Sequence, residues 1–339
     1  MQYVLGVDAG GTKTSAVVAD EDGTIFGAAV AGAGNFQGIG RIAATRNIAN
    51  AISAAINAAQ IEQSTIATAG YGIAGADRPK DFETVHEMLE EINVADQYLL
   101  TNDTTIALRA GTSDGVGVAL IAGTGSNTIG FNKEKQECKV GGLGKFTGDY
   151  GSATDLVEKA IIASMKGFDG RGPKTLLYDL FCRELSVKEL WDIIEFFYVD
   201  SYQYIEINQY APIVFTAADE GDHVALKLLK DTGKQVGHEA AVCIHKLFKK
   251  NDKITVVLGG SVFQKASNPV MVNSLTNYLI SRFPNLKIVK LQHEPVLGAV
   301  LFGLDILSKG KCSAAAQKNA ALSIAQKWMK EEFVRVAED

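Results

Sequence analysis

The chain has 339 residues, of which 47% are hydrophobic and 21% charged, and its 39 acidic and 33 basic residues give a net charge of −6. This composition is that of an ordinary globular protein, and the length suffices for about two domains. The acidic balance offers no extended positive surface for nucleic acid or an anionic membrane. No apolar run reaches the roughly 18 residues that a transmembrane helix needs, so we expect neither nucleic acid nor membrane as a partner.

Four cysteines are spread widely along the chain: Cys138, Cys182, Cys243 and Cys312. No two of them form a CxxC pair, which argues against a redox motif or a zinc site. The first apolar run is interrupted at Asp8 and Lys13, so it lacks the pattern of a signal peptide. We therefore expect reduced thiols in a cytoplasmic protein.

The first part of the chain predicts a β-meander followed by alternating helices and strands. Three strands are expected at 4–8, 14–20 and 25–30. They are followed in turn by a helix over 41–60, a strand over 65–74, a helix over 80–92, a strand over 97–102 and a helix over 104–110. The first of these helices is indicated by Ile48, Ile52 and Ile56, which recur every four residues on one face.

The same order of elements recurs roughly 115 residues later, which indicates an internal repeat. Strands are expected at 116–122, 126–132 and 139–142, followed by a helical insertion at about 150–250. The remaining expected elements are a strand over 254–258, a helix over 269–283, a strand over 286–289 and a helix over 296–307. The pattern β-β-β-α-β-α-β-α thus occurs twice. It predicts an α/β protein with a duplicated core.

We expect the two copies to form two domains that face each other across a cleft. The predicted boundaries are 1–114, joined by a terminal helix at about 313–339, for the first domain and 115–312 for the second. The short polar stretch 111–115 contains two glycines and suits a hinge.

Each predicted half carries a glycine-rich turn between its first two strands. The first turn is Asp8-Ala-Gly10-Gly11-Thr12-Lys13, and the second is Ala122-Gly-Thr124-Gly125-Ser126. Glycines let backbone N–H groups approach an anion closely, and threonine hydroxyls add donors. A plain hairpin explains either turn alone, but a matched pair suits the phosphates of ATP. Asp8 could then hold Mg²⁺ through water.

Two further motifs follow predicted strands. Gly259-Gly260-Ser261 would let a flat nucleotide approach the backbone, and Thr101-Asn102-Asp103 places a carboxylate where a substrate hydroxyl could give up its proton. Helix capping is the alternative interpretation of both motifs, with Ser261 or Asp103 as the capping residue.

Together these motifs resemble the phosphate and adenosine motifs of the sugar kinase, Hsp70 and actin superfamily. Within it the chain resembles the BadF/BadG/BcrA/BcrD ATPase family, especially its N-acetylglucosamine kinases. The segments that carry the resemblance include Gly34-Asn35-Phe36, Thr101-Asn-Asp103, Gly123-Thr-Gly-Ser-Asn127, Gly148-Asp-Tyr-Gly-Ser152 and Glu294-Pro-Val-Leu-Gly298. The resemblance implies two actin-like (ribonuclease H-like) domains, and the transfer of phosphate from Mg²⁺-bound ATP to the C6 hydroxyl of an amino sugar. We also expect a homodimer.

The resemblance also implies roles for single residues. Asp103 resembles the catalytic base and is expected to contact the sugar, while Asp8 is the metal ligand expected from its place at the strand end. The other expected sugar ligands are Asn35, Ser126, Asn127 and Asp149. The expected ATP ligands are Gly10, Gly11, Thr12, Lys13, Thr124, Gly125, Gly259, Gly260 and Ser261. A surface loop explains Asn35 equally well, and a helix cap explains Asp149.

Several alternatives stay open at this point. N-acetylglucosamine is the favoured substrate, but glucosamine and N-acetylmuramic acid differ from it only around C2 and C3, and Leu143 and Tyr150 stand where such kinases often carry Trp or another bulky residue. An ATPase that activates a 2-hydroxyacyl-CoA dehydratase is disfavoured, because Ala122 stands where the cluster cysteine would precede the glycines. A zinc-containing sugar kinase would need a cysteine cluster. A non-enzymatic cytoskeletal module is the remaining alternative.

Overall fold

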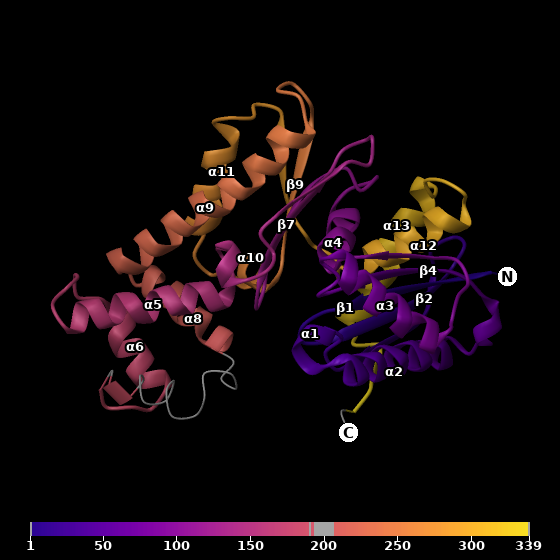
Figure 1. Cartoon of the computed structure of the whole chain (residues 1–339), viewed down its shortest axis with the longest axis horizontal. Coiled ribbons are helices and arrows are strands. Elements are labelled where there is room, and N and C mark those ends of the chain that lie inside the picture. The colour runs from indigo at the N-terminus through magenta and orange to yellow at the C-terminus, as the bar shows by residue number, and fades with distance from the viewer. Residues whose placement is uncertain (1, 190, 193–206, 338–339) are drawn as a thin grey trace. The chain divides into compact units, whose positions relative to one another are not determined.

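The computed structural model describes residues 2–189, 191–192 and 207–337 (Figure 1). The chain forms two compact units. Unit 1 comprises Met1–Ala119, Ile129–Glu137 and Val289–Asp339, and unit 2 comprises Leu120–Thr128 and Cys138–Ile288. Each is described separately below.

The first sheet has six strands in the order β11-β3-β2-β1-β4-β5. Its strands are β1 (Tyr3–Ala9), β2 (Thr14–Asp20), β3 (Ile25–Ala31), β4 (Ile66–Ile73), β5 (Tyr98–Thr101) and β11 (Val334–Arg335). β1 runs antiparallel to β2 and parallel to β4. In this register Asp8 lies opposite Ser15 on β2 and Gly72 on β4, so its carboxylate stands near the end of a central strand.

Helices cover both faces of this sheet. They are α1 (Phe36–Ile39), α2 (Arg41–Ala59), α3 (Pro79–Ile92), α4 (Asp103–Gly111), α12 (Val296–Leu307) and α13 (Ala314–Met329), with a 3₁₀ turn, η1, at Gln63–Thr65. Alternate residues of a strand point to opposite faces. Leu5 accordingly packs in the core that contains α2, whereas Val4 packs in the core that contains α12 and α13.

The second sheet has five strands in the order β10-β9-β6-β7-β8. They are β6 (Gly117–Ala122), β7 (Ser126–Phe131), β8 (Glu137–Val140), β9 (Ile254–Gly259) and β10 (Leu286–Lys290). Numbered from its own first strand, this order is 5-4-1-2-3, and the same order runs through β5 to β3 of the first sheet. The repeat predicted from the sequence therefore has a counterpart in the strand order.

The helices of unit 2 lie mainly in the predicted insertion. They are α5 (Ala153–Phe168), α6 (Leu176–Glu184), α8 (Ala211–Asp219), α9 (His223–Leu247), α10 (Ser261–Lys265) and α11 (Val270–Ile280), with 3₁₀ turns η2 at Lys145–Thr147 and η3 at Ile207–Tyr210. α9 packs along α11, where the position of a Cβ on Gly233 lies 2.2 Å from the Met271 carbonyl oxygen. The part of the insertion over 193–206 lies outside the described residues.

α12 was expected within a second domain of 115–312, but in the structure it packs on the first sheet and against α4. A Cβ on Gly298 would lie 1.8 Å from the Ile106 carbonyl oxygen, so only glycine allows this approach. The fully buried Arg109 of α4 also donates to the Asp305 carboxylate of α12, at 3.1 and 3.2 Å. The predicted domain boundaries themselves stay a prediction.

The third strand of the second sheet was predicted too far along the chain. A strand was expected over 139–142, but β8 ends at Val140 because Gly141 and Gly142 adopt φ angles of 65° and 83°. These left-handed conformations start a loop that carries Asp149.

Within the described part of the chain, no helix is both long and apolar enough to cross a bilayer.

Candidate active site

The first glycine turn closes the β1–β2 hairpin in unit 1. The Gly10 N–H donates to the Lys13 carbonyl at 2.9 Å, and the N–H groups of Gly34 and Asn35 donate to the Gly10 carbonyl at 2.9 and 3.2 Å. A Cβ placed on Gly11 would have no protein atom within 4 Å. The fold therefore does not require glycine at position 11, and the open space beside it suits the approach of a ligand.

The second glycine turn joins β6 to β7 and is tied to α5. The Gly123 N–H donates to the Gly125 carbonyl at 2.9 Å, and the Ala153 N–H donates to the Gly123 carbonyl at 2.8 Å. The Thr154 hydroxyl donates to the Thr124 carbonyl at 2.9 Å. Cβ positions on Gly123 and Gly125 again meet no atom within 4 Å. Both turns thus share an anchored base and an open tip, as expected for anion-binding loops.

The Gly259-Gly260-Ser261 motif has a different local role. Gly260 has φ 90°, and a Cβ on it would lie 2.3 Å from the Ala122 carbonyl oxygen, so the chain needs glycine there for its own packing. Gly260 is also the N-cap of α10, and Ser261 is the first helical residue. The alternative interpretation, in which Ser261 caps this helix, is therefore wrong. Ser261 is exposed at the start of the helix.

Asp8 belongs to a group of charged side chains in unit 1. Burial raises its pKa to about 7, and the neighbouring carboxylates of Asp103 and Glu294 add to the effect, while Lys13 opposes it. The Lys13 ammonium forms an ion pair with Glu294 at 2.9 Å. An excess of negative charge around Asp8 would be relieved by a cation.

The donor set fits Mg²⁺ held mainly through water. In the described residues no group of three or more His, Cys, Asp or Glu side chains could enclose a metal ion. Mg²⁺ usually retains several waters and is held by one or two carboxylates together with substrate phosphates. Asp8, with Asp103 as a charged neighbour, meets that requirement.

Asp103 is the first residue of α4, but Asn102 caps the helix. The Asn102 side-chain oxygen accepts the Thr104 N–H at 2.9 Å, and its amide donates to Asp77 at 2.9 Å. The alternative interpretation, in which Asp103 is the helix cap, is therefore wrong. Its carboxylate is partly exposed at the positive end of the helix dipole, which favours a negative charge.

Asp149 organises the loop that follows β8 in unit 2. Its carboxylate accepts the N–H groups of Gly142 and Gly144, at 3.0 and 2.6 Å, and the Thr147 hydroxyl at 2.7 Å. The cap of α5 is Ser152, so the interpretation of Asp149 as that cap is wrong. The loop is held by the carboxylate itself.

The remaining candidate sugar ligands lie on different elements. Asn35 caps the short helix α1, and its side-chain oxygen accepts the Gln37 N–H at 3.0 Å, so it does more than lie in a surface loop. Asn127 on β7 packs against the glycine loop, since a Cβ on Gly142 would meet its side-chain oxygen at 2.5 Å. The Ser126 hydroxyl oxygen is buried and has no hydrogen-bond partner in the described part of the chain.

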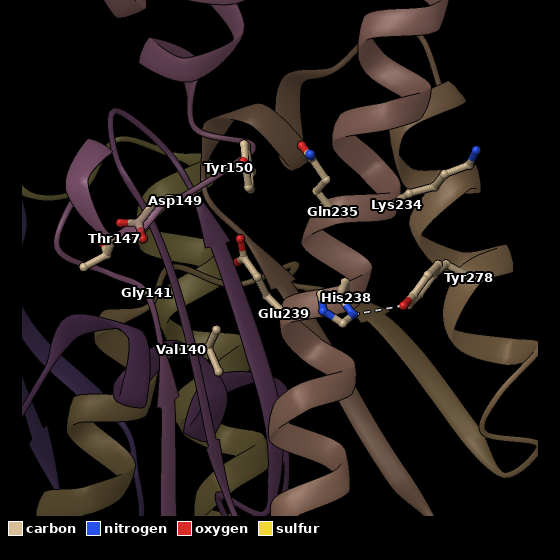
Figure 2. Close-up of a pocket in the computed structure, with 11 residues that line it drawn as sticks. Val140, Gly141, Thr147, Asp149, Tyr150, Lys234, Gln235, His238, Glu239 and Tyr278 are labelled. Carbon is tan, nitrogen blue, oxygen red and sulfur yellow. Dashed lines mark hydrogen bonds between the residues drawn. The ribbon is translucent and has the colours of Figure 1, made fainter.

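A pocket of about 460 Å³ lies beside Asp149 within unit 2 (Figure 2). The loop contributes one wall, and α9 and α11 contribute the other. Its lining residues are Val140, Gly141, Thr147, Gly148, Asp149, Tyr150, Lys234, Gln235, His238, Glu239 and Tyr278. His238 Nδ1 and the Tyr278 hydroxyl share a hydrogen bond of 3.0 Å at this wall.

Sequence reasoning found the loop side of this pocket but missed the helix side. Residues 234 and 235 lie one helical turn before residues 238 and 239, so all four form one polar face of α9. That polar face was the available signal, but one face of a long surface helix is commonly polar for solubility alone.

Within unit 1 the structure brings together Asp8, Lys13 and Asp103 as charged neighbours, with Gly10 bonded to Asn35. Within unit 2 it brings Asn127 and Asp149 to the same glycine loop. Gly260 lies against Ala122, directly before the second turn.

Comparison with known proteins agrees with this arrangement. The model of the BadF/BadG/BcrA/BcrD ATPase family matches residues 5–303 of the chain. The chain belongs to the BadF/BadG/BcrA/BcrD ATPase family. The match spans both glycine turns, the Asp149 loop and the Gly259–Ser261 motif, so the resemblance predicted from the sequence is confirmed.

Two curated relatives of this family member are similar over nearly their whole length. An N-acetylmuramic acid/N-acetylglucosamine kinase of Clostridium acetobutylicum is 28% identical over 312 residues, covering 92% of this chain and 100% of the relative. An N-acetyl-D-glucosamine kinase of Dictyostelium discoideum is 28% identical over 316 residues, covering 90% and 98%.

A solved structure with the same fold comes from Chromobacterium violaceum, where the protein is provisionally named an N-acetylglucosamine kinase. It matches with a TM-score of 0.70 at 22% identity, over 89% of this chain and 99% of that chain. This likeness confirms the predicted fold class, an α/β protein of the actin-like type with two sheets.

Proposed function

We propose that this family member is an ATP-dependent amino-sugar kinase that phosphorylates the C6 hydroxyl of its substrate, with N-acetylglucosamine as the preferred sugar. The observation that carries the proposal is the position of Asp103. Its carboxylate is not needed as a helix cap, and it lies in the charged group around Asp8. The names of the two curated relatives support the same activity.

ATP is proposed to bind through the two open glycine turns. The proposed phosphate contacts are Gly10, Gly11, Thr12 and Lys13 of the first turn and Thr124 and Gly125 of the second turn. Because Lys13 is already paired with Glu294, a phosphate would have to compete for its ammonium group or share it. Gly259, Gly260 and Ser261 are proposed to line the adenosine site.

Mg²⁺ is proposed to bind near Asp8 and to neutralise charge on the transferred phosphoryl group. The residues of the chain then have separate tasks. Asp8 would hold the hydrated ion, and its raised pKa is expected to fall as the cation binds. The glycine turns would orient the phosphates without side chains between them and the backbone.

The proposed sugar contacts are Asn35, Asp103, Ser126, Asn127 and Asp149. Asp103 would accept the proton of the C6 hydroxyl and hold its oxygen in line for attack on phosphorus. Phosphoryl transfer depends mainly on such positioning and on charge neutralisation.

The proposal is tested by measuring ADP release with Mg·ATP and a panel of sugars. We expect at least about tenfold stimulation by N-acetylglucosamine, since sugar-induced closure suppresses idle hydrolysis in enzymes of this type. Stronger stimulation by glucosamine or N-acetylmuramic acid would identify that sugar as the preferred substrate and leave the kinase assignment in place. ADP release that no sugar changes would overturn the kinase assignment.

The oligomeric state and the location in the cell are also proposals. We propose a homodimer, which light scattering of the purified protein would test, and a cytoplasmic location, which cell fractionation would test.

A further inference from the structure

Glu239 joins three elements around the pocket of unit 2. It projects from α9, and its carboxylate accepts the Thr128 hydroxyl at 3.0 Å and the backbone N–H of Tyr150. Figure 2 shows the side chain reaching from the helix toward Asp149 and Tyr150. One carboxylate is thus bonded to strand β7 and to the end of the glycine loop at once.

Both bonded residues adjoin candidate sugar ligands. Thr128 directly follows Asn127 on β7, and Tyr150 directly follows Asp149 in the loop. The backbones that carry Asn127 and Asp149 are therefore tied to the same side chain of α9. Movement of Glu239 would be transmitted to both through one or two covalently linked residues.

Burial of the Glu239 carboxyl group would destabilise the folded protein if these hydrogen bonds did not form. Burial raises its pKa to about 7, with further contributions from the nearby carboxylates of Asp149 and Asp155, against the lowering effect of its two hydrogen bonds. A carboxyl group that is buried without partners strongly disfavours the folded state. Two lysines lie nearby. The Lys159 ammonium group forms an ion pair with Asp155 at 2.8 Å, and Lys234 is exposed to solvent at the rim of the pocket.

We propose that Glu239 is a positioning residue for sugar binding, which holds β7 at Thr128 and the glycine loop at Tyr150 in the spacing that Asn127 and Asp149 need. It acts through these two residues and does not itself contact the reacting atoms. The proposal rests on the proposed function for its effect on the sugar, but the bracing of the loop is independent of it.

Two variants separate bracing from charge. Glu239→Ala removes both hydrogen bonds, whereas Glu239→Gln keeps an oxygen that accepts the Tyr150 N–H and an amide that can bond the Thr128 hydroxyl. Glu134→Gln is the matched control, since Glu134 is an exposed residue of the turn between β7 and β8. Thr128→Val removes one of the two bonds with little change in shape.

The first measurement is hydrogen exchange of the loop at 141–151 in the free, full-length protein. We expect several-fold faster exchange there in Glu239→Ala, an intermediate effect in Thr128→Val, and the parent's exchange in Glu239→Gln and Glu134→Gln. The double variant Thr128→Val with Glu239→Ala should exchange no faster than Glu239→Ala alone, because both changes remove the same bond. Parent-like exchange in Glu239→Ala would overturn the brace, whether or not any sugar is phosphorylated.

The second measurement is the kinetics with sugar and ATP varied separately. Glu239→Ala should raise the KM for the sugar about tenfold or more, as expected when buried hydrogen bonds that order a site are lost, and should leave the KM for ATP within about twofold. Glu239→Gln should restore the sugar KM. Equal losses for sugar and ATP, or an unchanged sugar KM, would contradict the positioning role. Should Glu239→Ala fail to fold, Thr128→Val carries the same test with a smaller expected shift.

Discussion

Asn102 caps the helix that Asp103 begins. The Asn102 side chain accepts the Thr104 N–H at 2.9 Å, so the neighbouring carboxylate of Asp103 is not needed for that bond. Two adjacent polar residues thus have distinct positions, one in the helix cap and one in the charged group around Asp8. The two can be separated by substitution.

Asp103→Asn should lower kcat about 10²–10⁴-fold, because the amide cannot accept the substrate proton. The affinity for ATP and the thermal stability should stay close to those of the parent protein. Asn102→Ala provides the contrast, since loss of a helix cap typically costs about 0.5–2 kcal/mol of unfolding free energy. Steady-state kinetics and thermal unfolding measure both variants, and near-normal turnover by Asp103→Asn would remove its role as a base.

Gly11→Val should raise the apparent KM for ATP without destabilising the protein. Apart from Gly11 itself and its two chain neighbours, no atom of the described chain lies within 4 Å of the new Cβ, so we expect the side chain to fit in the free protein and to obstruct a bound phosphate. Gly260→Ala, in contrast, should destabilise the protein and lower its melting temperature. The φ of Gly260 is 90°, and the new Cβ would lie 2.3 Å from the Ala122 carbonyl oxygen. Calorimetry and ATP titration distinguish the two. If Gly11→Val titrates with ATP like the parent, the first turn is only structural.

Asp149→Ala should weaken sugar binding about tenfold or more while ATP binding persists, because a lost buried hydrogen-bond partner costs about 1–3 kcal/mol. The same substitution releases three donors of the loop, so a control is needed. Thr147→Val removes only one of these bonds and keeps the carboxylate. Isothermal titration with sugar should show a much smaller loss for Thr147→Val, whereas equal losses would reduce Asp149 to a loop anchor.

The pKa of Glu239 predicts a change of stability with pH. The value rises from 4.5 to about 7 on folding, so between these limits the folded protein binds more protons than the unfolded chain. The contribution of this group to stability is therefore complete below the unfolded pKa and is lost as the pH rises through about 7. The carboxylates of Asp149 and Asp155 add to the effect of burial, and Lys234 and His238 are further titratable residues that line the same pocket.

Glu239→Gln should flatten this part of the stability profile, as measured by urea unfolding between about pH 5 and about pH 8. Asp8, whose pKa is also raised to about 7, contributes a slope of the same sign, so each variant is compared with the parent at every pH. An identical slope in Glu239→Gln and the parent would show that Glu239 titrates normally.

The sequence predicted the fold well because its signals are local and repeated. The period of Ile48, Ile52 and Ile56 defines α2, and all three are buried in the structure. The duplicated order of elements in the sequence has a counterpart in the matching strand orders of the two sheets. The packing of α12 on the first sheet was missed, because it depends on a close approach of Gly298 to Ile106 that no local pattern encodes.

The candidate site was predicted only in part. The glycine turns are recognisable because the same pattern of glycines and threonines follows the first strand of each repeat, whereas either turn alone could be a plain hairpin. Glu239 was missed because its partners, Thr128 and Tyr150, are distant in sequence and only the packing of α9 brings them together. Its neighbour His238 was missed for the same reason, since the structure bonds it to Tyr278, 40 residues away in the sequence.

The most direct test of the proposed activity is the identity of the product. The purified protein is incubated with Mg·ATP and N-acetylglucosamine, and the product is characterised by mass and by phosphorus–proton correlation in NMR. The account predicts one new phosphate ester whose phosphorus couples to the C6 protons, formed in proportion to ADP and formed about 10²–10⁴-fold more slowly with Asp103→Asn. Formation of ADP and free phosphate with no sugar ester, or an ester at another hydroxyl, would contradict it.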